Sequence, residues 1–235
     1  MRRLFALGLV ALSACLESPQ SEVAYSAFAT SDLASSFEAN GIRVRLSRAE
    51  FAFGPAYFCA ASSGSSALCK SALGEIVQVS RIDLLAPGPQ ALGTVKGFTG
   101  QVRSVSYDLG LHWFDTSFAV EPSSTAPEAH SMVFEGTLAR VGEPEEGFRL
   151  VVDVVPQYHG QRAVPTAPAE AEIADERTKL TVVLTPEAWL RQIDFDAVLR
   201  TAKRPIVLDT KSPAHDAVLV GLKVARPPEF RFSRL

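Results

Sequence analysis

The chain is poor in the residues that bind soft metals: its 235 residues include three cysteines, four histidines and two methionines. None of the histidines has another histidine or a cysteine two, three or four positions away. Local metal motifs need such spacing because neighbouring ligands must point at one ion. The sequence therefore contains no local metal-binding motif, and we expect no bound cofactor.

Two alternatives remain open because distant residues can meet in the fold. His112 beside Trp113, and His130 near Met132, are the features closest to a copper site. An alternative interpretation is therefore a periplasmic copper-binding protein that draws its ligands from five residues. These candidates are His112, His130, Met132, His159 and His215. A second alternative is a hydrolase whose active site assembles only in three dimensions, since no Gly-x-Ser-x-Gly nucleophile motif is present.

Positive charge is also scarce. The chain has 23 Lys and Arg against 26 Asp and Glu, a formal net charge of −3, and this becomes −5 without residues 1–14, which include Arg2 and Arg3. An acidic chain is a poor nucleic-acid binder. No apolar run approaches the roughly 20 residues that a membrane-spanning helix needs.

The N-terminus has the layout of an export signal. Arg2 and Arg3 precede an apolar run over residues 4–14, which is too short for a permanent span, so residues 1–14 are predicted to be a cleaved signal peptide. The quartet Leu12-Ser13-Ala14-Cys15 resembles the lipobox of bacterial lipoproteins. That resemblance implies a lipidated Cys15 as the mature N-terminus and a bilayer as its partner, because several acyl chains on one residue hold a protein firmly. Leu16, in place of an inner-membrane Asp signal, favours the outer membrane.

Alternating apolar residues predict that the rest of the chain is mainly β. Ile42, Val44 and Leu46 share one face of a strand, and residues 132–138 and 148–154 are predicted to form a hairpin across a Gly- and Glu-rich turn. Thr185-Pro186-Glu187 is typical of a helix start. We therefore expect a signal peptide (1–14), a lipidated N-terminus and flexible tether (15–40), and a single antiparallel β-sandwich-like domain (41–235) with one or two short helices in its C-terminal part. Residues 23–28 of the tether could still add an edge strand. Residues 156–178 are interpreted as a long loop that is either functional or mobile.

Two cysteines remain once Cys15 is lipidated. An exported protein meets an oxidising compartment, so Cys59 and Cys69 are predicted to form a structural disulfide. A metal site or free, redox-active thiols are the alternatives.

A second resemblance covers most of residues 41–232. The segments Gly54-Pro55-Ala56-Tyr57-Phe58-Cys59, 93–110 and Trp189-Leu190 with Asp194-Phe195-Asp196 loosely resemble a group of uncharacterised secreted bacterial lipoproteins. The resemblance implies a sandwich-like domain and adds no activity. The leading interpretation is a membrane-anchored, non-catalytic structural or binding protein of the cell envelope.

Overall fold

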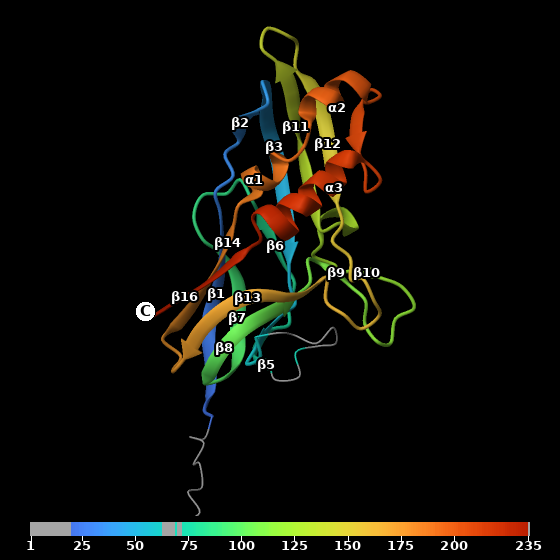
Figure 1. Ribbon diagram of the computed structural model, residues 1–235. Coiled ribbons are helices and arrows are strands. Elements are labelled where there is room, and N and C mark those ends of the chain that lie inside the picture. Colours follow the sequence, from blue (N-terminus) through green and yellow to red (C-terminus); the bar gives the residue numbers. More distant parts are fainter. Residues whose placement is uncertain (1–19, 63–68, 70–71, 235) are drawn as a thin grey trace, which may run out of the picture.

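The structure, a computed structural model, describes residues 20–62, 69 and 72–234. Its chain is built mainly from strands, which form two large sheets, with a few short helices in the C-terminal part (Figure 1). This confirms the predicted β-sandwich-like fold. Within the described residues, no helix is long and apolar enough to cross a membrane.

The larger sheet, sheet A, has eight strands. In spatial order they are β13 (Val164–Ile173), β8 (Gly100–Tyr107), β4 (Ala56–Cys59), β5 (Ala72–Ile76), β7 (Gln90–Phe98), β1 (Glu22–Ser31), β14 (Thr178–Leu184) and β16 (Glu229–Arg234). All pairs are antiparallel except β1 with β14, which run parallel. The N-terminal strand therefore lies inside the sheet, between two partners.

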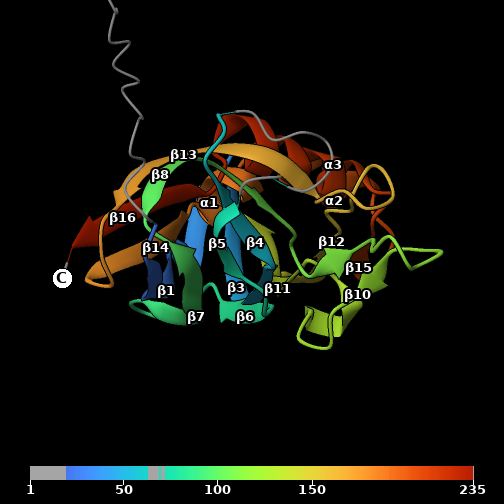
Figure 2. The same cartoon turned by 90° about the horizontal axis from the view of Figure 1, so that it is seen from below.

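Sheet A curls until its two outer strands approach each other. β13 and β16 are in contact, and seen from below β8 and β13 arch across toward β16 (Figure 2). Aromatic rings fill the curl: the Phe230 ring of β16 lies 6.2 Å from that of Phe58 and 5.4 Å from that of Tyr107. Such edge-to-face and tilted pairs are favourable ring geometries. The curl thus buries one face of the sheet on itself.

The second sheet, sheet B, has six strands. In order they are β15 (Ile206–Leu208), β12 (Glu146–Val152), β11 (Met132–Arg140), β3 (Ile42–Phe53) and β2 (Ser36–Ala39), with β6 (Ser80–Asp83) also paired to β3. Met132 pairs with Val152 and Leu138 with Glu146, which confirms the predicted hairpin. The alternation of β3 changes phase at a bulge, where the register with β11 shifts between Glu135 and Gly136.

Beyond β3 the chain crosses from sheet B to sheet A at Gly54-Pro55. Gly54 has φ +109°, in the region that favours glycine, and a side chain there would meet the backbone of Gln78. The predicted turn at this position is therefore present, and it places β4 directly after β3.

Short helices cover one side of sheet B (Figure 1). They are α1 (Pro186–Leu190), α2 (Phe195–Thr201) and α3 (Pro213–Val220), with η2 (Gly221–Ala225) directly after α3 and a single turn η1 (Pro127–Ala129) elsewhere. The amide of Ala197 donates 2.9 Å to the Asp194 side chain, which caps α2. Trp189 of α1 is fully buried, and its ring lies 5.8 Å from that of Phe51 in β3. Helix α1 is thereby joined to sheet B.

Two sequence-based boundaries need correction. Residues 22–31 form β1 inside sheet A, where a flexible tether with at most an edge strand at residues 23–28 was expected, and residues 164–173 form β13 where a loop was expected. In both strands, most of the inward positions are alanines, such as Ala27, Ala29, Ala167 and Ala169. Alanine contributes a weak apolar signal, so the period of two was hidden. The prolines of β13 fit its place at the sheet edge.

Candidate functional site

A buried ion pair lies where β8 ends and the segment before β13 passes it. Asp108 is fully buried; its Oδ2 accepts a hydrogen bond of 2.7 Å from Arg162 Nη1 and its Oδ1 accepts one of 2.7 Å from the amide of Ala163. Burial raises the pKa of Asp108, and the two hydrogen bonds oppose that rise. The pair fixes the position of the Arg162 guanidinium.

Arg162 is held from a second side by Tyr57 of β4. The guanidinium carbon lies 4.7 Å from the centre of the Tyr57 ring, a cation–π contact. Nη2 also approaches the Tyr57 hydroxyl at 3.4 Å. Nε of Arg162 is shielded from solvent and has no hydrogen-bond partner within the described structure. One donor of this buried cation is thus left unsatisfied, which is costly and unusual.

His112, in the short strand β9 (Leu111–His112) that pairs with β10 (Glu121–Pro122), borders the same cluster. Its Nδ1 lies 3.8 Å from Asp108 Oδ2, too far for a hydrogen bond, and has no partner among the described residues. Desolvation, and then the positive charge of Arg162, lower the pKa of His112. The imidazole is therefore biased toward its neutral form.

Arg162 opens onto a pocket of about 280 Å³. Its walls come from β8, the 155–163 segment, β13 and the turn after α3. The apolar lining consists of Tyr107, Val155, Ala163, Val164, Pro165, Ala167, Pro168, Leu222 and Pro227, and the polar lining of Gln157, Gln161, Arg162, Thr166 and Lys223. Mostly apolar walls with a few convergent polar groups are typical of small-molecule sites.

Lys223 places a second cation at this pocket. Arg162 is paired with Asp108, and Lys223, an exposed residue of the lining, supplies the second positive charge there. Desolvation lowers the pKa of Lys223, and a nearby anion would offset that effect. The arrangement suits a ligand with an apolar body and one negative group.

Two other candidate ligands, His130 and His215, meet at Asp153. His130 Nδ1 lies 2.9 Å from Asp153 Oδ1, and His215 Nε2 lies 3.2 Å from the carbonyl oxygen of Asp153. His215 Nδ1 is 3.1 Å from Asp216 Oδ1. The two rings are thus engaged with oxygens of the protein itself.

The remaining candidates lie elsewhere. The ring of His159 lies 5.5 Å from that of Trp113, in the loops next to the Asp108 cluster, and Met132 is fully buried in the core of sheet B. No three or more His, Cys, Asp or Glu side chains are grouped to hold a metal ion in the part of the chain that the structure describes.

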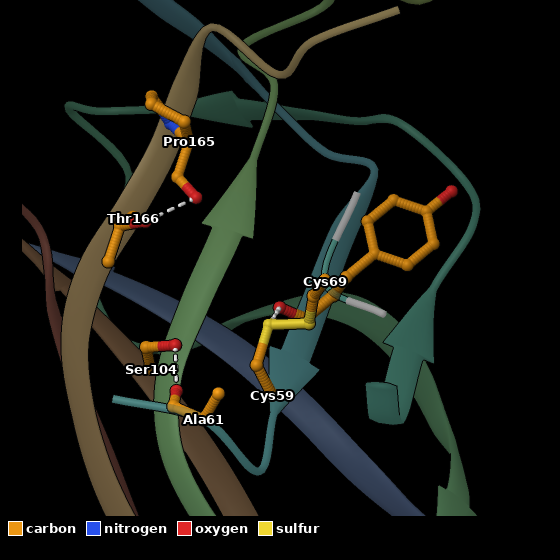
Figure 3. The surroundings of a disulfide bond; sticks show 7 residues. Cys59, Ala61, Cys69, Ser104, Pro165 and Thr166 are labelled. Atoms are coloured by element: carbon orange, nitrogen blue, oxygen red, sulfur yellow. Dashed lines mark hydrogen bonds between the residues drawn. A yellow bond between two sulfur atoms is a disulfide. The ribbon is translucent and has the colours of Figure 1, made fainter. Parts of the chain in front are cut away.

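Cys59 and Cys69 are joined by a disulfide, as predicted, with their Cα atoms 5.7 Å apart (Figure 3). Beside the bridge, Ser104 of β8 donates a hydrogen bond of 2.6 Å to the carbonyl of Ala61 (Figure 3). Ala61, two residues after Cys59, is thereby attached to β8. Cys15 lies outside the described residues.

Sequence reasoning did not identify Asp108, Arg162 or Lys223. For the segment around Arg162, the sequence predicts only a long loop over residues 156–178. No local spacing links Asp108 to Arg162, because 54 positions separate them. The sequence signal for this site is limited to Arg162 itself, which lies between the polar residues 157–161 and a segment that contains Pro165 and Pro168.

Comparisons with known proteins add little. No family model and no curated protein matches the chain. A solved structure, MbnP from Methylosinus trichosporium, is similar at 11% sequence identity and a TM-score of 0.37, and the match covers 92% of this chain and 99% of that one. A similarity at this level supports no inference about function.

Proposed function

We propose that this protein is a lipid-anchored envelope protein that binds a small molecule with an apolar body and one anionic group in the pocket beside Arg162 and Lys223, and that it performs no chemistry on that molecule. The pocket that combines apolar walls with Arg162 and Lys223 carries the proposal. The anchor rests on the lipobox resemblance at Cys15. The outer membrane is the proposed location because Leu16 follows the cysteine.

Binding fits the site better than catalysis. Both oxygens of Asp108 accept hydrogen bonds from Arg162 and Ala163, so this carboxylate is occupied in holding the guanidinium in place. No hydroxyl or thiol side chain partners Nδ1 of His112 in the described structure. A nucleophile and a base need such contact to work together. The cluster therefore positions a cation instead of activating a nucleophile.

The size and charge of the pocket define the ligand class. About 280 Å³ accommodates a molecule with a single ring or a short chain. A carboxylate or phosphate group would lie toward Arg162 and Lys223, because guanidinium and ammonium groups both bind such anions. The apolar body would contact the walls from β13 and Leu222.

The test uses benzoate and octanoate as probes, with benzyl alcohol as the uncharged counterpart of benzoate. Saturation-transfer NMR on the purified protein should detect both carboxylates and a much weaker signal from the alcohol. Lys223→Gln should weaken carboxylate binding about tenfold, which corresponds to about 1.4 kcal/mol for a charged contact. Lys211→Gln removes the same charge from a residue outside the pocket lining and should leave binding unchanged.

Equal binding of benzoate and benzyl alcohol, or equal effects of the two lysine substitutions, would refute the anion site. Arg162 itself is a poor first variant, because its loss would leave Asp108 as an unpaired buried charge.

A metal titration tests the copper alternative. We expect no copper or zinc binding with a Kd below about 1 μM, or about 8 kcal/mol, under non-reducing conditions. Stoichiometric binding that is lost on substitution of His112 or His130 would replace the present proposal with the metal one.

A further inference from the structure

The anchor and the first strand are separated by very little chain. Cys15 and Ser21 are six residues apart, and β1 begins at Glu22. Six extended residues span at most about 20 Å. If Cys15 carries acyl chains in a bilayer, the start of β1 must lie within that distance of the membrane surface.

The end of the body at which β1 begins is well defined. Glu22 pairs with Phe98 at the end of β7, and Ser21 exchanges two hydrogen bonds with Thr99, the residue between β7 and β8. The amide of Thr99 donates 2.9 Å to the Ser21 carbonyl, and the amide of Ser21 donates 3.0 Å to Thr99 Oγ1. The β7–β8 hairpin is therefore attached directly to the first described residues after the anchor.

This hairpin carries an exposed aromatic side chain. Phe98 is 42% exposed and borders an open hollow of about 660 Å³ together with Val23, Ala24, Gly74 and Gly97. An exposed phenyl ring within reach of a bilayer gains by entering the boundary between headgroups and acyl chains.

The charged residues around the hollow restrict the contact with the bilayer to the end of the β7–β8 hairpin. Glu22, Glu75 and Glu176 line it against a single lysine, Lys96. A net negative rim repels anionic lipid headgroups. The fitting partner is thus a zwitterionic bilayer surface, approached through Phe98 and not through the charged rim.

The opposite end of the molecule serves as an internal reference. The β11–β12 turn lies at the far end from the start of β1 (Figure 1) and carries Val141, which is 89% exposed. β1 alone rises about 33 Å over its ten residues. Val141 is thus more exposed than Phe98 but lies far from the anchor, so the two positions separate exposure from closeness to the anchor.

We propose that the β7–β8 hairpin end rests on the bilayer that holds Cys15, with Phe98 in the interface, while the β11–β12 turn projects away. This orientation depends on the lipid anchor proposed above. The contact is secondary to the anchor and fixes which surfaces of the body face outward.

The test uses the full mature lipoprotein in phosphatidylcholine vesicles that contain brominated acyl chains. Phe98→Trp and Val141→Trp are compared after subtraction of the parent emission from Trp113 and Trp189. The indole at 98 should shift to shorter wavelength and lose emission to the brominated lipid, whereas the indole at 141 should do neither. Adding phosphatidylglycerol should not strengthen the quenching at 98. Circular dichroism checks that both variants fold like the parent.

Equal quenching at 98 and 141 on vesicle-bound, lipidated protein would overturn the orientation and leave the anchor intact. Quenching at 98 that requires anionic lipid would also overturn it, because the contact would then be electrostatic. Mass spectrometry of the N-terminal peptide separates these results from failure of the anchor itself: an unmodified Cys15 on a protein that stays in the aqueous phase removes both proposals.

Discussion

Arg162 Nη1 donates a hydrogen bond of 2.7 Å to Asp108 Oδ2, and the two residues are buried although 54 positions separate them in sequence. Removing one member of a buried pair leaves the other as an uncompensated charge. The pair therefore holds the 155–163 segment against β8 and keeps the pocket wall in place.

Asp108→Asn should lower the free energy of unfolding by about 3 to 5 kcal/mol, because the amide leaves Arg162 buried without its counter-charge. Urea denaturation followed by circular dichroism measures this loss. Glu229→Gln is the matched control: it breaks an exposed pair with Arg231 and should change stability little. Similar losses in the two variants would show that the buried pair has no special role.

His112 predicts a pH dependence of stability. Desolvation and Arg162 lower its pKa from 6.5 in the folded state, so the unfolded chain binds more protons as the pH falls. The stability due to neutral His112 is complete above about pH 6.5 and is lost below it. The stability advantage of the parent over His112→Gln should therefore be greater at pH 7.5 than at pH 5.5. A difference that is constant or grows toward acid would contradict the assignment; His159→Gln, in an exposed loop position, serves as the control.

The disulfide predicts a loss of stability on removal. Cys59 and Cys69 are ten positions apart, and closing a loop of that size stabilises a fold by about 2.5 to 3 kcal/mol on the chain-entropy estimate. The double variant Cys59→Ser, Cys69→Ser should lose about that much in chemical denaturation. Adding a reductant should destabilise the parent and leave the double variant unaffected. If the reductant also destabilised the double variant, its effect on the parent could not be assigned to the disulfide.

Gly97 of β7 predicts a steric effect. A Cβ atom there would meet the carbonyl oxygen of Leu73 in β5, so Gly97→Ala should destabilise the fold by about 1 to 3 kcal/mol through overpacking. Gly147→Ala in β12 is the control, because nothing lies within 4 Å of its Cβ position. Thermal unfolding of both variants decides; equal midpoints would mean that β5 and β7 can move apart freely.

Local patterns predicted the elements whose signals lie within a few residues of each other. The β11–β12 hairpin follows from alternation around one turn, and the disulfide from the count of cysteines in a chain expected to be exported. The sequence predicted β1 only as an optional edge strand and did not predict β13, because alanines occupy most of the buried positions of both strands. The cluster at Asp108 was missed for another reason: an ion pair between segments that meet only through the curl of sheet A leaves no local spacing to detect.

The parallel pairing of β1 with β14 has a consequence for how this chain folds. Residues 26–31 of β1 align with residues 179–184 of β14. β1 is therefore made early in synthesis but can pair with β14 only after about 150 further residues have followed. Contacts between residues so far apart in sequence form slowly, because the entropy of closing the long loop is lost before the contacts contribute any stabilising free energy. Sheet A therefore cannot be completed on a partly emerged chain. Under the proposed export, this delay would keep the chain open while it passes through a narrow channel.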